Sequence, residues 1–352
     1  FTLYIPMSGD DAYLLDPDGT LVHTWFGVHG PGLSCYLRDN GNLLRTINTA
    51  SGPAGAGGGF QEVDWDGTVV WEYRYDGAAG LQHHDIEPLP NGNVLLIAWQ
   101  KRTVTEALNA GRNPAIVSGS RFWPTQVLEI EQTGPTSGQI VWQWDSWNHI
   151  IQDFDPNKPN FGDPALNPGK IDLNFPFRNV SNGDWMHVNG IDYHPGLDQI
   201  VLSINYWSEI WVIDHSTTTQ EAAGSTGGNS GRGGELLYRW GNPQAYGAGT
   251  SGDQILYGQH DATWISPGFP GEEDILIYNN GVNRPGSDYS TVDQITPPLQ
   301  PGGTYALTPG QAYGPANVTW RYTANPPTSL FSPIISGAER LANGNTLITE
   351  GI

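Results

Sequence analysis

The stretch Pro90-Asn-Gly-Asn-Val-Leu-Leu-Ile97 joins an Asn-Gly turn to a run of four apolar residues. Asn-Gly beside apolar segments is a strong hairpin signal, because both residues accept a positive φ. Copies of this stretch recur along the chain, so the sequence is built from a repeated hairpin unit. They stand at Asp39-Asn-Gly-Asn-Leu-Leu-Arg45 and Ala342-Asn-Gly-Asn-Thr-Leu-Ile348 and, with altered turns, at Asp198-Gln-Ile-Val-Leu-Ser203 and Glu273-Asp-Ile-Leu-Ile-Tyr278.

An aromatic strand closes each unit, and a third strand such as Gln126-Val-Leu-Glu-Ile130 precedes it. Four short strands in each repeated unit predict an all-β fold, a six-bladed β-propeller with four-stranded antiparallel blades around a central channel. The closing strands are Leu21-Val-His-Thr-Trp25, Val69-Val-Trp-Glu-Tyr73, Ile140-Val-Trp-Gln-Trp144, Leu236-Leu-Tyr-Arg-Trp240 and Val318-Thr-Trp-Arg-Tyr322.

We expect residues 1–352 to form one propeller domain. Its first piece lacks a first strand and its last piece lacks two strands, so the two pieces merge into a closing blade or the missing strands lie beyond Ile352. The chain starts at Phe1 without a signal-like segment, so we expect a processed or truncated N-terminus, and the last stretch stops in mid-pattern, which is compatible with a truncated C-terminus. The blades are expected near residues 1–27, 31–76, 83–147, 186–241, 259–323 and 335–352.

The composition supports this fold and excludes several functions. Charged residues make up only 14% of the chain. The 14 tryptophans and 15 tyrosines favour a β fold with aromatic packing between its layers and disfavour a helical protein. The net charge of −21 repels phosphate backbones, so we expect no nucleic-acid partner. No run of 18 apolar residues is present, so we expect no membrane span, and Cys35 as the sole cysteine excludes an intrachain disulfide.

Three histidines enter the first strands of consecutive blades, in Gln82-His-His-Asp85, Met186-His-Val-Asn189 and Gln259-His-Asp-Ala262. First strands line the channel of a propeller, so we expect His84, His187 and His260 to meet at one level of it. Asn189 shares a face with His187 by its period-2 spacing. Asp85 and Asp261 directly follow a histidine, point away, and are expected to tie blades together.

Two kinds of chemistry suit three channel histidines. A neutral imidazole can act as a nucleophile, with neighbouring His and Asn side chains donating to oxyanions. Three imidazoles can instead hold a metal with open positions. The spacing is compatible with either. Segments leaving the second strands on the same face add candidate substrate-binding residues. These are Lys101, Arg102, Asn205, Tyr206 and Arg284.

The sequence resembles the bacterial arylsulfotransferase family over essentially its whole length. The resemblance is carried by Gln82-His-His-Asp-Ile-Glu-Pro-Leu-Pro-Asn-Gly-Asn93, Ser208-Glu-Ile-Trp-Val-Ile-Asp-His-Ser-Thr217, Arg239-Trp-Gly-Asn-Pro243 and Gly258-Gln-His-Asp-Ala262. It implies a periplasmic or secreted six-bladed propeller. It also implies transfer of a sulfuryl group from an aryl sulfate to a phenol through a sulfated histidine, without the nucleotide donor PAPS, any other cofactor or a metal.

Matched by motif, the resemblance gives each residue a role. His260 would be the nucleophile, His187 and Asn189 would bind the sulfuryl oxygens, and His84 would be a further donor or acid–base group. Characterised members carry an Arg where this chain has Asn205, which removes a fixed positive charge from an anion site. Two other functions therefore stay open: a different enzyme using the same histidines, such as a polysaccharide lyase or a metal-dependent enzyme, and a non-catalytic extracellular binding or assembly propeller.

Overall fold

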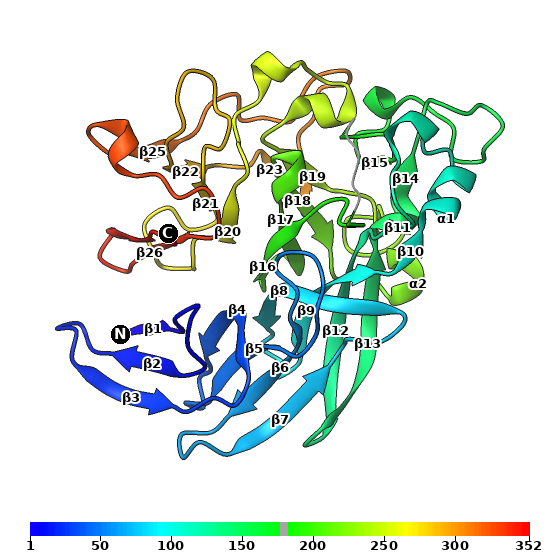
Figure 1. The fold of residues 1–352 in the computed structure, drawn as a ribbon. Coiled ribbons are helices and arrows are strands. Elements are labelled where there is room, and N and C mark those ends of the chain that lie inside the picture. Colours follow the sequence, from blue (N-terminus) through cyan, green and yellow to red (C-terminus); the bar gives the residue numbers. More distant parts are fainter. Residues whose placement is uncertain (177–181) are drawn as a thin grey trace.

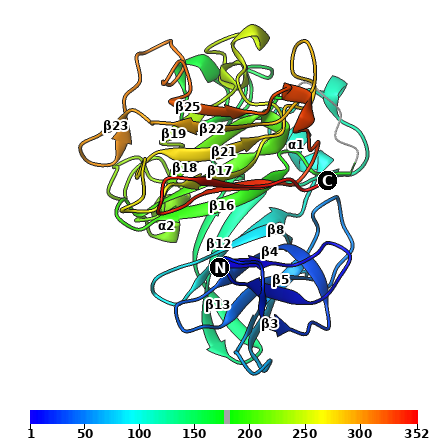
Figure 2. The same ribbon diagram turned by 90° about the vertical axis from the view of Figure 1, so that its left-hand side faces the viewer.

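A computed structural model describes residues 1–176 and 182–352. Antiparallel sheets radiate from a common axis, and the N-terminal and C-terminal sheets lie on the same side of the molecule (Figures 1 and 2). The all-β propeller predicted from the repeats is confirmed. We number the sheets 1 to 6 in chain order; sheets 2 to 5 have four strands each, whereas sheet 1 has three and sheet 6 has two.

Within each complete sheet the strands pair in chain order, and the first strand lies nearest the axis. Sheet 2 holds β4 (Gly30–Leu37), β5 (Leu43–Asn48), β6 (Gly58–Val63) and β7 (Val69–Arg74); sheet 3 holds β8 (Gly80–Pro88), β9 (Val94–Gln100), β12 (Thr125–Gly134) and β13 (Ser137–Asp145). Sheet 4 holds β16 (Val188–His194), β17 (Gln199–Ile204), β18 (Glu209–Asp214) and β19 (Tyr238–Trp240); sheet 5 holds β20 (His260–Trp264), β21 (Ile275–Asn279), β22 (Thr291–Ile295) and β25 (Trp320–Thr323).

The incomplete sheets and the inserts complete the fold. Sheet 1 holds β1 (Thr2–Tyr4), β2 (Ala12–Leu15) and β3 (Leu21–Trp25), and sheet 6 holds β26 (Gly337–Arg340) and β27 (Thr346–Thr349). The inserts carry the helices α1 (Val104–Asn109) and α2 (Thr219–Ala222) and the short pairs β10 (Arg102–Thr103) with β11 (Arg121–Phe122), β14 (Ile150–Ile151) with β15 (Ile171–Asp172), and β23 (Leu299–Gln300) with β24 (Thr304–Tyr305). Of the helices in the described part of the chain, none has the length and apolar character needed to cross a bilayer.

The repeated Asn-Gly-Asn turns do more than reverse the chain. Gly41 and Gly92 take φ of 86° and 93°, as the turn requires. The asparagine side chain that follows each glycine reaches the third strand of its own sheet: Asn42 donates to Glu62 at 2.7 Å, and Asn93 donates to Glu129 at 2.6 Å. The turn therefore fixes the spacing of three strands.

Tryptophans of the outer strands bind the next sheet. The indole N–H of Trp25 donates to the Asp64 carbonyl at 2.9 Å, and that of Trp71 donates to the Ser137 carbonyl at 3.2 Å. Trp144 donates in the same way to the Gly234 carbonyl at 2.7 Å. All three rings are buried, so each of these three closing strands provides both apolar packing and one polar contact to its neighbour.

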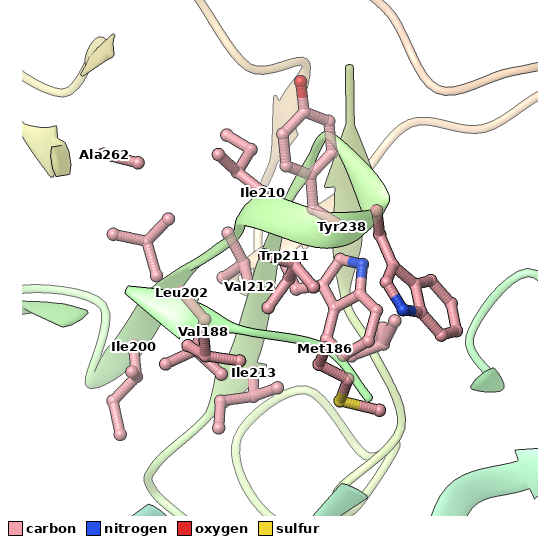
Figure 3. Close-up of a cluster of buried hydrophobic side chains, with 14 of the residues drawn as sticks. Met186, Val188, Ile200, Leu202, Ile210, Trp211, Val212, Ile213, Tyr238 and Ala262 are labelled. Carbon is pink, nitrogen blue, oxygen red and sulfur yellow. The ribbon is translucent and has the colours of Figure 1, made fainter. Parts of the chain in front are cut away.

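The largest apolar cluster extends through sheets 3, 4 and 5. Figure 3 shows its centre, with Val188, Ile200 and Leu202 from β16 and β17 of sheet 4 and Ala262 from β20 of sheet 5. This packing holds β16 against β20, so the residues at the start of both strands have fixed positions near the axis.

Half-buried carboxylates link the first strands around the axis. Asp85 accepts the Ile191 backbone N–H at 3.2 Å, and Asp261 accepts the Ala338 N–H at 2.7 Å, as predicted for the aspartates that follow a histidine. Asp192 adds the same link from sheet 4 to the Trp264 N–H at 2.7 Å. Burial raises the pKa of Asp192 and that of Asp261 to about 7.

Replacing Asp192 by Asn should reduce the pH dependence of stability. The folded state binds more protons than the unfolded state between about pH 4 and the Asp192 pKa of about 7, so the free energy of unfolding falls as the pH rises through this window. The D192N side chain still accepts the Trp264 N–H but cannot ionise. We expect urea unfolding to show a smaller loss between about pH 5 and about pH 8 in D192N than in the native chain. The exposed Asp39→Asn change controls for net charge, and equal losses in D192N and the native chain would contradict the assignment.

Candidate functional site

A cavity of about 570 Å³ opens at the axis beside the incomplete sheets. One wall is apolar and comes from the N-terminal segment, with Leu3, Ile5 and Met7, and from Leu33. The opposite wall is polar and comes from the first strands of sheets 3 to 5. Its residues are His84, Asp85, Asn189, His260 and Asp261. An apolar wall facing a few convergent polar groups suits an aromatic molecule that carries one polar substituent.

His84 lies in a bulge of β8. Gln82 pairs with Ala98 and Ile86 pairs with Leu96, so residues 83–85 lie opposite Ile97 alone. The bulge gives His84 a left-handed φ of 51° and brings its Nδ1 within 3.0 Å of the His83 Nδ1. Gly55 covers the His84 ring so closely that a Cβ on this glycine would overlap the imidazole.

His187 precedes β16 and is held by a buried carboxylate. Its Nδ1 lies 2.6 Å from Asp184, whose other oxygen accepts the indole N–H of Trp99 at 2.9 Å. Burial favours a higher pKa for the Asp184 carboxyl, but the hydrogen bond and the charge of His187 outweigh it and lower this pKa. Asp184 therefore fixes the ring and favours a hydrogen on Nδ1.

His260 begins β20 and has partners on both ring nitrogens. Nδ1 lies 2.8 Å from Oδ1 of Asn280, and the Ile335 backbone N–H points at Nε2 from 3.2 Å. Burial lowers the pKa of His260 to about 4, and burial also lowers the pKa of His84 well below its ordinary value. Both imidazoles are therefore neutral at pH 7, the form in which a histidine nitrogen is a nucleophile.

The structure brings the three predicted histidines together, but not in equivalent positions. The rings of His84 and His187 meet edge to face with centroids 4.6 Å apart, and His84 lines the cavity together with His260. In sheet 4 the cavity wall is formed by Asn189, while His187 lies behind His84. A bulge between Val188 and Gly190 breaks the alternation from which Asn189 was expected to share a face with His187.

Other predicted polar residues have structural partners. Asn189 donates to the Gln259 carbonyl at 2.9 Å, and Asn205 donates to the Gly258 carbonyl at 2.8 Å, so both fasten sheet 4 to the start of sheet 5. Tyr206 stacks on His187 with centroids 4.6 Å apart. These three residues support the histidine cluster, and only Asn189 borders the cavity.

The predicted cations lie away from the cavity wall. Lys101 donates to the Gly77 carbonyl at 2.7 Å, Arg102 pairs with Glu106, and Arg284 lies 4.3 Å over the ring of Tyr289. Among the described residues that line the cavity, none is a lysine or an arginine, and the ionisable ones besides histidine include Asp85, Asp261 and Glu350. An anion bound there must be met by neutral donors.

Several site residues were not selected from the sequence. Asp184 stands three residues before His187, a spacing that could have indicated it, and Asn280 belongs to the segment Tyr278-Asn-Asn-Gly281 that leaves a second strand on the channel face. Gly55 gave no signal, because its contact with His84 spans two sheets. Within residues 1–176 and 182–352, no three His, Cys, Asp or Glu side chains are grouped as ligands for a metal ion.

Replacing Gly55 by Ala should displace the His84 ring and destabilise the protein. Gly41 has the same φ of 86° but open space around a Cβ, so Gly41→Ala isolates the cost of the left-handed conformation. We expect G55A to lower the free energy of unfolding by about 1–3 kcal/mol more than G41A, because the added methyl overlaps the imidazole. Urea unfolding of both variants measures the difference, and equal losses would contradict the contact.

Comparisons with known proteins give distant structural matches and identify the family. Among solved structures, hydrazine synthase of Kuenenia stuttgartiensis is 13% identical, with 84% of this chain and 70% of that chain covered and a TM-score of 0.44. A luciferin-regenerating enzyme is 7% identical, with 99% and 79% covered and a TM-score of 0.45. The periplasmic gluconolactonase PpgL of Pseudomonas aeruginosa is 13% identical, with 89% and 79% covered and a TM-score of 0.36.

Identities this low say nothing about shared chemistry. A comparison with curated proteins finds no match. The family model described as Arylsulfotransferase (ASST) matches residues 37–352, which is most of the chain and includes His84, His187 and His260. This protein belongs to the arylsulfotransferase family.

Proposed function

We propose that this protein transfers a sulfuryl group from an aryl sulfate ester to a phenol, through a sulfohistidine on His260 and without PAPS. The observation that carries the proposal is the buried, neutral imidazole of His260 on the polar wall of a cavity whose opposite wall is apolar. The apolar wall suits the aromatic ring of both substrates, and the family match supports the sulfuryl chemistry.

The first step is attack by Nε2 of His260 on the sulfur atom. The N–S bond forms, the S–O bond to the aromatic ring breaks, and its electron pair leaves on the phenolate oxygen, which takes a proton from a neighbouring imidazole or from water. In the second step the acceptor phenol passes its proton to the imidazole or water that gave one up in the first step, and its oxygen attacks the same sulfur. The electron pair of the N–S bond then returns to Nε2, so one histidine serves both halves of the reaction.

Neutral donors would stabilise the sulfuryl oxygens. His84 lines the cavity with His260, and the backbone N–H of Ile335 already points at Nε2. His187 lies against His84, the Asp184 carboxylate holds its ring at Nδ1, and we assign it the role of hydrogen-bonding the departing phenolate. Neutral donors around a developing charge are effective where water is excluded.

The acidity of the molecule bears on substrate and location. Asp85 and Glu350 on the cavity wall, with a net charge of −21, disfavour further negative groups on the substrates, so we propose aryl sulfates and phenols without a carboxylate. We also propose a periplasmic or secreted location, on the family match and on an acidic surface that favours solubility.

A non-catalytic binding role is the second candidate. Asn205 gives its amide to the carbonyls of Gly258 and Gln259, so it supplies no charge at the position where characterised enzymes carry an arginine. This role predicts that aryl sulfates bind without release of phenol. Isothermal titration combined with a phenol-release assay on the same sample separates the two functions.

Replacing His260 by Ala should abolish covalent transfer. Incubation of the native protein with an aryl sulfate and no acceptor is expected to add one sulfuryl group, located on His260 by peptide mass spectrometry. The H260A variant should gain none and should transfer at least about 1,000-fold more slowly, because nothing replaces the nucleophile.

The matched control for H260A is His23→Ala, since His23 stacks on Trp65 within the first two sheets and does not line the cavity. H23A should label like the native chain. Transfer at the native rate by folded H260A would remove His260 from the reaction.

The first step should tolerate acid. Only the neutral imidazole attacks, and burial lowers the His260 pKa to about 4, so the rate of phenol release in the first turnover should hold down to about pH 5 and fall near pH 4. Rapid-mixing measurements give this rate, with tryptophan fluorescence recorded at each pH to establish that the protein stays folded. A fall centred near pH 6.5 would contradict a buried, neutral nucleophile.

A further inference from the structure

Asn280 is a fully buried side chain directly after β21 and touches both His260 and the loop entering β26. Its Oδ1 lies 2.8 Å from Nδ1 of His260. Its Nδ2 donates to the Ser332 carbonyl at 2.8 Å and to the Ile335 carbonyl at 2.9 Å. Both polar atoms of the amide therefore have partners: Oδ1 faces His260, and Nδ2 donates to two backbone carbonyls.

These partners fix the orientation of the amide. A flipped amide would place Oδ1 against two carbonyl oxygens and Nδ2 against the imidazole. The amide would then lose both of the hydrogen bonds that Nδ2 donates. The backbone of Asn280 is also anchored, since its carbonyl accepts the Ser290 hydroxyl at 2.9 Å. An acceptor facing Nδ1 requires that the hydrogen of neutral His260 is on Nδ1, which leaves the lone pair on Nε2.

The same amide positions a donor at the reactive nitrogen. Ile335 has a left-handed φ of 51°, and its carbonyl is held by Asn280 while its N–H points at Nε2 of His260 from 3.2 Å. Nε2 thus has a weak donor beside it before any substrate binds. Once a sulfuryl group occupies Nε2, that N–H is free to donate to one of the sulfuryl oxygens.

We propose that Asn280 is a positioning residue that makes Nε2 the reactive nitrogen of His260 and holds the Ile335 N–H next to it. The proposal rests on the function proposed above. When Nε2 forms the N–S bond, the ring becomes positively charged and keeps its Nδ1 hydrogen, which Oδ1 of Asn280 continues to accept. When the acceptor oxygen takes the sulfur, the electron pair returns to Nε2 and the starting tautomer is restored.

The decisive measurement is the tautomer of His260. In protein labelled with ¹⁵N-histidine, the nitrogen shifts distinguish Nδ1–H from Nε2–H, and comparison with H260A identifies the His260 signals. We expect Nδ1–H in the native chain and a mixture of tautomers in Asn280→Leu, a variant of similar size that lacks the acceptor. An unchanged Nδ1–H tautomer in folded N280L would overturn the proposal.

The neighbouring asparagine supplies a matched control. Asn279 is equally buried and makes three hydrogen bonds, to the Tyr257 N–H, the Ile255 carbonyl and Asp293, but none to His260. N280L should slow the first sulfuryl transfer at least about tenfold, whereas N279L should slow it less than about twofold under conditions where both are folded. An equal slowing of the first transfer in the two variants would show that Asn280 has only a structural role, and it would overturn the proposal.

A second variant covers failure of N280L to fold. Asn280→Asp keeps an acceptor for Nδ1 and adds a negative charge, which should raise the His260 pKa. The fall of the first-turnover rate at low pH should then move toward neutral pH. The titratable groups around His260 are His84, His187, Asp261 on its own strand, and Asp85 and Glu350 on the cavity wall; all are unchanged in this variant. A fall at the same pH as in the native chain in folded N280D would overturn the proposal.

The tautomer result does not depend on turnover. If the native protein releases no phenol from any aryl sulfate, the proposed function fails, while the shifts of His260 in the native chain and N280L still decide whether Asn280 sets the tautomer. If phenol is released at equal rates by the native chain and N280L, the function stands and the positioning role fails.

Discussion

The burial of polar side chains near the axis is the constraint on which both fold and site depend. Each first strand carries polar side chains into this region, and a buried polar group without a partner costs about 1–3 kcal/mol. Asp85, Asp192 and Asp261 meet the requirement by accepting backbone N–H groups of the following sheet, and His260 meets it through Asn280. The contacts that close the fold and those that orient the imidazoles therefore belong to one network.

The same burial sets the chemistry that the site can support. Loss of hydration lowers the pKa of His260 and of His84, so these rings stay neutral and keep a lone pair on one nitrogen. It also means that an anion in the cavity has to rely on hydrogen-bond donors, because the described lysine and arginine side chains point to other partners. A histidine nucleophile with neutral donors is consistent with both facts.

The repeats predicted the propeller and the linking role of Asp85 and Asp261, because turn residues and strand periodicity act locally. The details of the histidine cluster depended on bulges. A bulge beside His84 and another beside Asn189 shift which side chain meets the cavity, and nothing in the local sequence marks them. Contacts across sheets, such as Gly55 with His84 and Asn280 with Ile335, required the folded chain.

Indole donors at the perimeter and carboxylate acceptors near the axis fasten successive sheets at two radii. Trp71 reaches sheet 3 at the outside, and Asp85 reaches sheet 4 at the inside. Unfolding of sheet 3 would therefore remove a hydrogen-bond partner from Trp71 of sheet 2 and from Ile191 of sheet 4. The geometry around His260 therefore depends on sheet 4, through Asp192 and Trp264, and on sheet 6, through Asp261 and Ala338, as well as on its own sheet.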